Sequence, residues 1–153
     1  MTTSVLSSAA IGSFIALGLL TATPGFTQGH AEEEAKLGSL MADGLLTVEP
    51  MLQTPLEDGR ILSIVRVELA PGVTEPHHTH PGKEVLYGLG GSGVVNTSVR
   101  TVPIETGTVV HVEAGQAKAL SNPSQSERLK VLAVLVLDPD EPALTVVGRQ
   151  DGN

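Results

Sequence analysis

Histidines gather in one short stretch of the chain. Of the five histidines, His77, His78 and His80 lie within four residues, and Glu84 follows four residues after His80. On an extended segment, residues i and i+2 project to the same side, so His78 and His80 present two imidazoles to one face. Pro81-Gly82 is a turn signal that folds the following carboxylate back toward them. Two imidazoles and one carboxylate with open positions are typical of a site for one divalent transition metal. A solvated histidine loop is the alternative.

The composition excludes several other kinds of chemistry. The length of 153 residues suits a single domain, and the absence of cysteine excludes thiol nucleophiles and thiolate metal sites. The formal net charge is −8, and the nine Lys and Arg residues form no cluster that would follow a phosphate backbone. Nucleic acid is therefore not expected as a partner.

The N-terminal segment 1–31 contains no Lys, Arg, Asp or Glu, and its centre, Ala9–Leu20, is apolar. This pattern resembles a secretory signal peptide, with cleavage after Ala22 or Ala31. It predicts a periplasmic or secreted protein with no stable membrane insertion after cleavage. The alternatives are an uncleaved membrane anchor over Val5–Phe26 and a disordered apolar leader.

The elements that must position the histidines are strands. Residues 32–44 predict a short helix or a linker. Over 45–147, about seven short apolar or alternating segments are separated by Gly and Pro turns, which is typical of a β-sandwich or barrel. Residues 148–153 form a tail. No second helical pattern separates the strands, so a parallel βαβ sheet is not expected.

Alternation along these strands assigns side chains to faces. In the stretch "ILSIVRVELA", Arg66 and Glu68 point the same way. They are interpreted as a solvated surface pair, with Arg66 as an anion clamp at the mouth of the pocket as the alternative. The continuous apolar run "LKVLAVLVL" is expected inside the core. Tyr87, three residues after Glu84, is expected to project opposite to it.

The chain resembles the cupin superfamily in two sequence motifs. The first motif is matched at every fixed position, by Gly72, His78, His80, Glu84 and Gly91. The resemblance covers roughly residues 45–147.

The second motif is matched less completely. Gly107, Gly115 and Asn122 stand at the expected places, whereas Glu113 replaces a proline and Lys118 replaces a histidine. The spacing between the two motifs is short, as in small bacterial single-domain cupins.

The resemblance implies an all-β fold, a single jelly-roll β-barrel with the short helix or linker before it and a metal in its mouth. His78, His80 and Glu84 are then three of the four usual ligands of Fe, Mn, Ni or Zn, and Lys118 stands at the fourth position. An ammonium group repels a cation, so two outcomes stay open. Either three ligands and waters hold the metal while Lys118 points away or is deprotonated, or the metal is lost and Lys118 pairs with Glu84 or binds an anion.

His111 is the other candidate for the fourth position. Alternation in "GTVVHVEAG" puts it opposite Val110 and Val112, which are expected to pack inward. His111 is therefore expected to point away from the barrel interior.

Two functions follow from the resemblance. The leading hypothesis is an exported cupin that uses a divalent metal to catalyse oxygenation or isomerisation of a small polar metabolite. The competing hypothesis is a non-catalytic module that binds a small molecule or a metal at an impaired site. Pairing of two copies through their outer sheets, as a homodimer, is implied by the resemblance alone.

Overall fold

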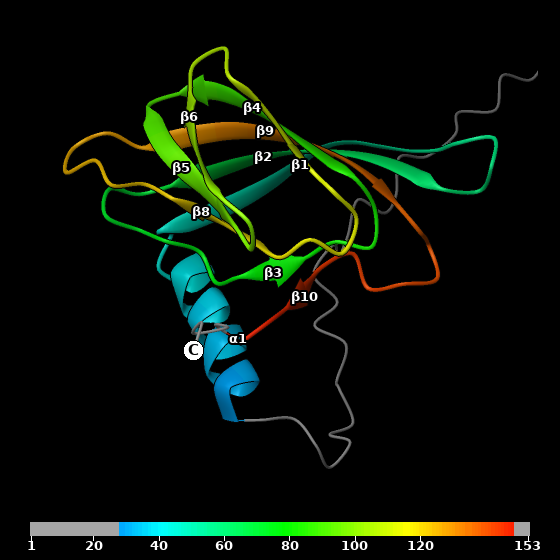
Figure 1. Ribbon diagram of the computed structural model, residues 1–153, viewed down its shortest axis with the longest axis horizontal. Coiled ribbons are helices and arrows are strands. Elements are labelled where there is room, and N and C mark those ends of the chain that lie inside the picture. The colour runs from blue at the N-terminus through cyan, green and yellow to red at the C-terminus, as the bar shows by residue number, and fades with distance from the viewer. Residues whose placement is uncertain (1–27, 149–153) are drawn as a thin grey trace, which may run out of the picture.

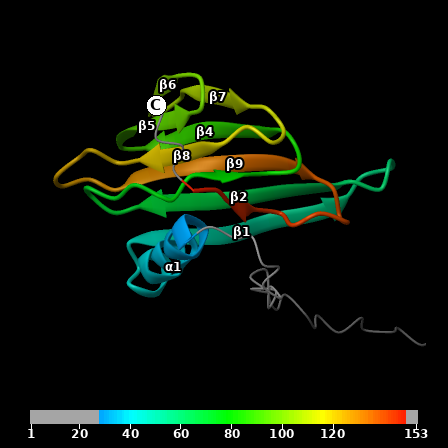
Figure 2. The same cartoon turned by 60° about the horizontal axis from the view of Figure 1, so that its bottom comes forward.

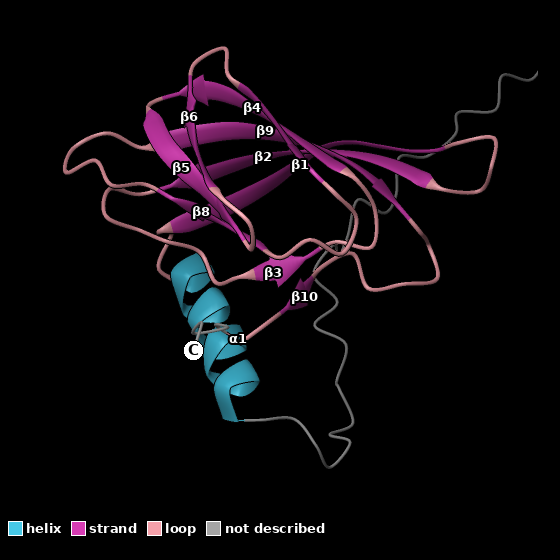
Figure 3. Cartoon of the chain, in the orientation of Figure 1, coloured by secondary structure: helices cyan, strands magenta, loops and turns pink. Residues whose placement is uncertain are grey.

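The computed structural model describes residues 28–148 (Figures 1 and 3). This part of the chain contains one helix, α1 (Gln28–Ala42), and ten strands in two five-stranded antiparallel sheets. The prediction of an all-β fold with a short N-terminal helix is confirmed, although the helix begins within the segment predicted as the leader. The rest of that leader lies outside the described residues. Within residues 28–148, no helix has the length and apolar character needed to cross a membrane.

The first sheet carries the longest strands. Its order is β1 (Leu46–Pro55), β2 (Ile61–Leu69), β9 (Leu129–Leu137), β4 (Glu84–Gly90) and β7 (Val109–Val112). The run "LKVLAVLVL" is β9, the central strand, and it pairs with β2 on one side and β4 on the other. As predicted for a core strand, its alternate residues from Leu129 to Leu137 are buried.

The second sheet is built from shorter strands. Its order is β10 (Thr145–Val146), β3 (His78–Thr79), β8 (Lys118–Ser121), β5 (Ser92–Thr97) and β6 (Thr101–Glu105). Figure 2 shows the long strands of the first sheet stacked beside one another, with β5, β6 and β8 facing them. More strands are present than the sequence predicted, because β3 and β8 are too short to show an alternating pattern and the stretch 91–102 holds β5 and the start of β6.

The core lies between the two sheets. Inward side chains of both sheets form one apolar cluster, which includes Leu69, Leu86, Val95, Leu120 and Val131. Helix α1 packs Leu37, Leu40 and Met41 against this cluster. The helix thereby covers one end of the barrel, beside β1 and β10 (Figure 1).

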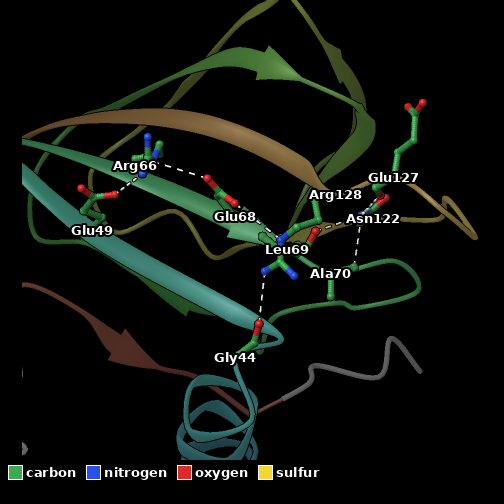
Figure 4. A network of polar contacts seen from close by, with 9 residues as sticks. All are labelled: Gly44, Glu49, Arg66, Glu68, Leu69, Ala70, Asn122, Glu127 and Arg128. Atoms are coloured by element: carbon green, nitrogen blue, oxygen red, sulfur yellow. Dashed lines mark hydrogen bonds and ion pairs between the residues drawn. The ribbon is translucent and has the colours of Figure 1, made fainter.

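A group of charged side chains lies on the outer face of the first sheet (Figure 4). The outer network, as we call it, consists of Glu49, Arg66, Glu68 and Arg128. Arg66 pairs with Glu49 on the neighbouring strand and lies 3.4 Å from Glu68 Oε1. Arg128 lies 3.5 Å from Glu68 Oε2 and donates to the Gly44 carbonyl. Arg66 is thus a surface residue in ion pairs, as predicted, rather than an anion clamp in the mouth.

Candidate functional site

Strands β3, β4 and β8 bring the predicted site residues together inside the barrel. His78 on β3 is directly opposite Lys118 on β8 in the antiparallel register. Glu84 is the first residue of β4 and faces inward, because alternation also buries Leu86 on the same side. Val85 and Tyr87 point outward from this strand, as predicted for Tyr87.

Lys118 lies between two carboxylates. Its Nζ is 3.3 Å from Glu84 Oε1 and 3.5 Å from Glu75 Oε1. All three residues are buried, with exposed fractions of 3% for Lys118, 2% for Glu84 and 5% for Glu75. Burial by itself lowers the pKa of Lys118, but the negative charges of Glu84 and then Glu75 outweigh it and raise that pKa above its usual value. Lys118 is therefore an ammonium ion at neutral pH.

Two neutral imidazoles lie next to this ion pair. The His78 and His80 rings are 5.0 Å apart and nearly perpendicular. Burial first, and then the charges of Lys118 and His80, holds the pKa of His78 well below its usual value. Burial also lowers the pKa of His80, although the charge of Glu84 opposes it. Both rings are consequently uncharged at neutral pH.

Backbone carbonyls fix the tautomer of each ring. His78 Nδ1 lies 2.9 Å from the Pro76 carbonyl, and His80 Nδ1 contacts the Ala143 carbonyl. A carbonyl oxygen only accepts, so Nδ1 carries the proton in both rings and Nε2 holds a lone pair. His80 Nε2 lies 3.7 Å from Glu84 Oε1. The two Nε2 atoms and the carboxylate are thus all acceptors.

The five residues Glu75, His78, His80, Glu84 and Lys118 form what we call the buried cluster. With neutral histidines, its formal charge is −1, from two carboxylates and one ammonium. Acceptors outnumber donors, and Glu84 Oε2 is buried without a hydrogen-bond partner among the described residues. This charge and donor balance disfavour an anion at Lys118 itself, which was one of the open outcomes.

Sequence reasoning missed Glu75. Its Oε1 accepts a hydrogen bond of 2.7 Å from the Leu120 backbone N–H in addition to its contact with Lys118. Glu75 fills a variable position of the first motif, so the spacing gave no sign of a role. The one available signal was Lys118 itself, because a lysine inside a barrel needs carboxylates to balance its charge.

The donor set fits a divalent metal ion poorly. His78 Nε2, His80 Nε2 and Glu84 are the right kinds of donor, but the Lys118 ammonium lies against the same carboxylate. Among residues 28–148, no three His, Asp or Glu side chains are arranged to hold a metal ion. As folded here, the residues do not fit a resident divalent ion.

His111 is separate from the buried cluster. It faces Val85 across the β4–β7 ladder, on the outer side of the sheet, while Val110 and Val112 point inward. It lies near Glu113, with 3.6 Å between His111 Nδ1 and Glu113 Oε1. The structure thus leaves the fourth position to Lys118.

The C-terminal segment covers the buried cluster. β10 pairs with β3, placing Val146 opposite His78, and the Ala143 carbonyl contacts His80. Further along this segment, the Gly148 N–H donates to His30 Nδ1 on α1 at 3.2 Å. Helix α1 and this C-terminal segment together close the end of the barrel that holds the cluster.

Asn122, the last residue of the second motif, has a structural role. Its buried amide donates to the carbonyls of Leu69, Ala70 and Glu127, at 3.0, 3.1 and 2.8 Å. Figure 4 shows these bonds beside the outer network. The amide ties the end of β2 to the turn before β9, and this explains why the motif needs an amide here without any contact to the cluster.

Comparisons with known proteins agree with this geometry. The family described as "Cupin domain" matches residues 65–135, which include His78, His80, Glu84 and Lys118. No curated protein matches the sequence.

Many solved structures have a similar fold. The protein TT1209 of Thermus thermophilus is 25% identical, with a TM-score of 0.54 over 63% of this chain and 87% of that one. The polyketide cyclase RemF of Streptomyces resistomycificus is 19% identical, with a TM-score of 0.56 over 70% and 74% of the two chains. The DMSP lyase DddQ of Ruegeria pomeroyi is 18% identical, with a TM-score of 0.54 over 71% of this chain and 54% of that one. The shared fold confirms the predicted jelly-roll barrel, and these neighbours include enzymes.

Proposed function

This chain belongs to the cupin superfamily as a small single-domain protein, and from that premise we propose that it is a ligand-binding module whose central cation is an ammonium. In this proposal Lys118 takes the place that a divalent metal commonly has in cupins. The observation that carries the proposal is the burial of Lys118 between Glu75 and Glu84.

Electrostatics disfavour a metal beside this ammonium. At ~4 Å and an effective dielectric constant of ~20, two unit charges repel by about 4 kcal/mol, and a divalent ion beside a unit charge by about 8 kcal/mol. Glu84 would also have to exchange its contact with Lys118 for one with the metal. Removing one partner from a buried ion pair leaves an uncompensated charge, which is costly.

Binding without turnover is supported by the protonation of the cluster. A general acid or base works best with a pKa near the working pH. The pKa of His78 is held well below its usual value, and the pKa of Lys118 is raised above its usual value. Neither group is therefore tuned for proton transfer at neutral pH.

Divalent metal binding is the second candidate, and one observation favours it. Glu84 Oε2 is buried without a hydrogen-bond partner in the described residues, and both Nε2 atoms carry lone pairs. If Lys118 swung away, these three donors would remain for Fe, Mn, Ni or Zn, and that metal would supply Lewis-acid or redox chemistry when bound.

Elemental analysis of the purified protein separates the two candidates. We expect the natural protein to carry metal well below one equivalent and Lys118→His to carry close to one. Adding His78→Ala to Lys118→His should then abolish the gain. Lys130→His, which adds a histidine at an exposed position of β9, is the matched control and should gain nothing.

A natural protein with one equivalent of metal that His78→Ala removes would overturn the ammonium proposal in favour of the metal candidate. If Lys118→His gains no metal, the assignment of His78, His80 and Glu84 as a shared donor set is wrong.

Export remains a second part of the proposal. Cleavage after Ala22 would leave α1 whole, whereas cleavage after Ala31 would remove His30, which accepts the Gly148 N–H. We therefore favour Ala22. Mass spectrometry of the protein from the periplasm or medium should give a chain beginning at Thr23, and an intact N-terminus in a membrane fraction would support the anchor instead.

A homodimer is the third part, and the outer side of the first sheet supports it. Its outward side chains form what we call the outer apolar face: Leu62, Ile64, Val85, Tyr87, Val109, Leu132, Val134 and Val136. Tyr87 and Val109 are 40% and 63% exposed. Contiguous apolar patches on the surface of a soluble protein often mark an interaction site.

Charge points to a second copy of the chain as the occupant of this face. The chain has a formal charge of −8, which makes most of its surface repel another copy. The edge of the outer apolar face carries charges of both signs, since Arg66, Arg128 and Lys130 lie there beside Glu49 and Glu68. Two copies related by a twofold axis could therefore meet here without net repulsion and with both signs available for pairing.

Light scattering after size exclusion tests the dimer. Val134 is central in the face, paired with Ile64 and Val85, so Val134→Lys should convert a dimer into a monomer. Val94→Lys, at a half-buried outward position of the second sheet between Ser121 and Pro103, should leave the dimer intact. A monomeric natural protein would refute this part alone.

A further inference from the structure

A cleft opens where the free edges of the two sheets meet. β7 is the last strand of the first sheet and β6 the last strand of the second, and the two strands contact each other (Figure 2). The cleft has a volume of about 370 Å³, a size that suits a small molecule. Val99, Val102 and Val110 give it an apolar wall, and Arg100 also lines it.

The turn that carries Arg100 is held by hydrogen bonds. Thr97 Oγ1 donates to the Arg100 carbonyl at 2.8 Å and accepts from the Arg100 N–H at 3.1 Å. The Ser98 N–H donates to the Ala117 carbonyl at 3.2 Å, which joins this turn to the one between β7 and β8. The cleft is therefore largely formed before any ligand arrives, which reduces the entropy lost on binding.

The second turn is fixed as well, and it connects the cleft to the buried cluster. Gln116 Oε1 accepts from the Glu113 N–H at 3.2 Å. Gly115, with a φ of 71°, donates its N–H to the His80 carbonyl at 2.8 Å. On the other side, Thr97 of the cleft is the register partner of Lys118. The cleft thus adjoins the cluster at the turn before β8 and through the pairing of β5 with β8.

Arg100 supplies an uncommitted cation. Over residues 28–148, its guanidinium takes part in no hydrogen bond or ion pair, and only its backbone does. The one carboxylate of the cleft, Glu113, is already engaged, 3.4 Å from Lys83 Nζ and 3.6 Å from His111 Nδ1. In a chain of formal charge −8, the cleft thus offers one guanidinium without a partner among residues 28–148.

We propose that the cleft binds a small monocarboxylate with a short apolar body. The carboxylate pairs with Arg100, whose planar fork suits two parallel hydrogen bonds, and the carbon chain packs on Val99, Val102 and Val110. A single uncommitted cation beside an apolar wall matches one negative charge on an apolar molecule better than a multiply charged phosphate. This inference rests on the proposed function, because it names the ligand class of the same barrel.

The carboxylate belongs at Arg100 rather than at Lys118. The buried cluster already carries a formal charge of −1, from Glu75, Glu84 and Lys118, and would repel a second anion. The ligand therefore lies with its charged end at Arg100 and its apolar body against the valines.

Titration of the full-length protein with butanoate, followed by ¹H–¹⁵N NMR, tests the inference. We expect saturable shifts at Thr97, Arg100 and Val102, and weaker shifts with butanamide, which has the same shape without the charge. Arg100→Leu should weaken binding at least about tenfold, because a charge-assisted pair is lost, and Arg100→Lys should weaken it less. Arg60→Leu, which removes an exposed arginine paired with Asp58, is the matched control and should change nothing.

Two results would overturn the inference. One is the absence of any saturable shift in the cleft with butanoate, and the other is binding that Arg100→Leu leaves unchanged, with shifts at His78 and Lys118. Neither result touches the ammonium proposal, which depends on the metal content of Lys118→His. Conversely, a full equivalent of metal in the natural protein would refute the ammonium proposal without affecting the Arg100 titration.

Discussion

The buried cluster and the outer network contain similar ions in opposite surroundings. Inside the barrel, Lys118 bridges two carboxylates and is 3% exposed. Outside, Arg66 also bridges two carboxylates, Glu49 and Glu68, but its side chain is 43% exposed. Both groups join strands of the barrel. The difference between them shows how burial, rather than the number of ion pairs, decides what a charge does in a fold.

Water accounts for the contrast. An exposed ion pair contributes little to the free energy of unfolding, because water solvates each charge nearly as well as its partner does and salt screens the remaining attraction. In a buried site no water replaces a missing partner, so each remaining charge depends on the others. The cluster therefore acts as a unit, whereas the members of the outer network act almost independently.

The largest effect is expected from removing the buried cation. Lys118→Met keeps most of the length of the side chain but leaves Glu75 and Glu84 without their counter-ion. We expect a loss of about 3–5 kcal/mol in the free energy of unfolding, the usual cost of one missing partner in a buried ion pair. Urea denaturation followed by circular dichroism measures it.

The control removes the carboxylates together with the cation. A triple variant, Glu75→Gln, Lys118→Met and Glu84→Gln, has no buried formal charge at these positions and should be more stable than Lys118→Met alone. If the triple variant is instead less stable, the contacts of Glu75 and Glu84 with other groups outweigh their charge, and the cluster is not an electrostatic unit.

The sequence predicted the fold and most of the buried cluster, since both depend on local patterns. Alternation and turn residues indicated the strands, and the spacing of His78, His80 and Glu84 placed them on one inner face. Lys118 was also identified, because it stands where a histidine is expected. These predictions succeeded where the information lies within a single strand and the turn beside it.

Glu75 and the C-terminal segment over the cluster could not be predicted, because their contacts do not lie within a single strand and its turn. The contact of Glu75 with Lys118 joins β8 to a segment 43 residues earlier in the sequence, and no periodicity marks it. The covering segment reaches His80 through a backbone carbonyl, at Ala143, and any residue type supplies a carbonyl. Contacts made by backbone atoms or by isolated residues across the barrel leave no pattern to recognise.

An intermediate effect on stability is expected when the pH is lowered, and it should come from the two histidines of the buried cluster. The pKa values of His78 and His80 are lowered in the folded protein, whereas in the unfolded chain they return to about 6.5. Below pH ~6.5 the unfolded state therefore takes up protons that the folded state does not, and stability falls as pH falls toward the lowered values. Each histidine contributes up to about 1.4 kcal/mol per pH unit in that window.

Urea denaturation between pH 7.5 and 5.5 measures this slope. His78→Leu should reduce the slope, because one titrating group is lost, even if the variant is less stable at every pH. His111→Leu, at an exposed position on the outer side of β7, should leave the slope unchanged. A slope that is the same in all three proteins would mean that the buried histidines are not the groups that titrate.

The smallest effect is expected from the outer network. Arg66→Met is the counterpart of Lys118→Met, since it also removes a cation from between two carboxylates, but water remains to solvate Glu49 and Glu68. We expect it to cost between about 0 and 1 kcal/mol, as exposed ion pairs do. The loss should shrink further as salt rises from ~0.05 to ~0.5 M, because screening removes the same interaction in the natural protein. Urea denaturation at the two salt concentrations measures both quantities. If Arg66→Met instead costs as much as Lys118→Met and the cost does not change with salt, the outer network is shielded from water. A second copy of the chain lying over it would have that effect. The contrast between the two groups would then hold only for the separated monomer.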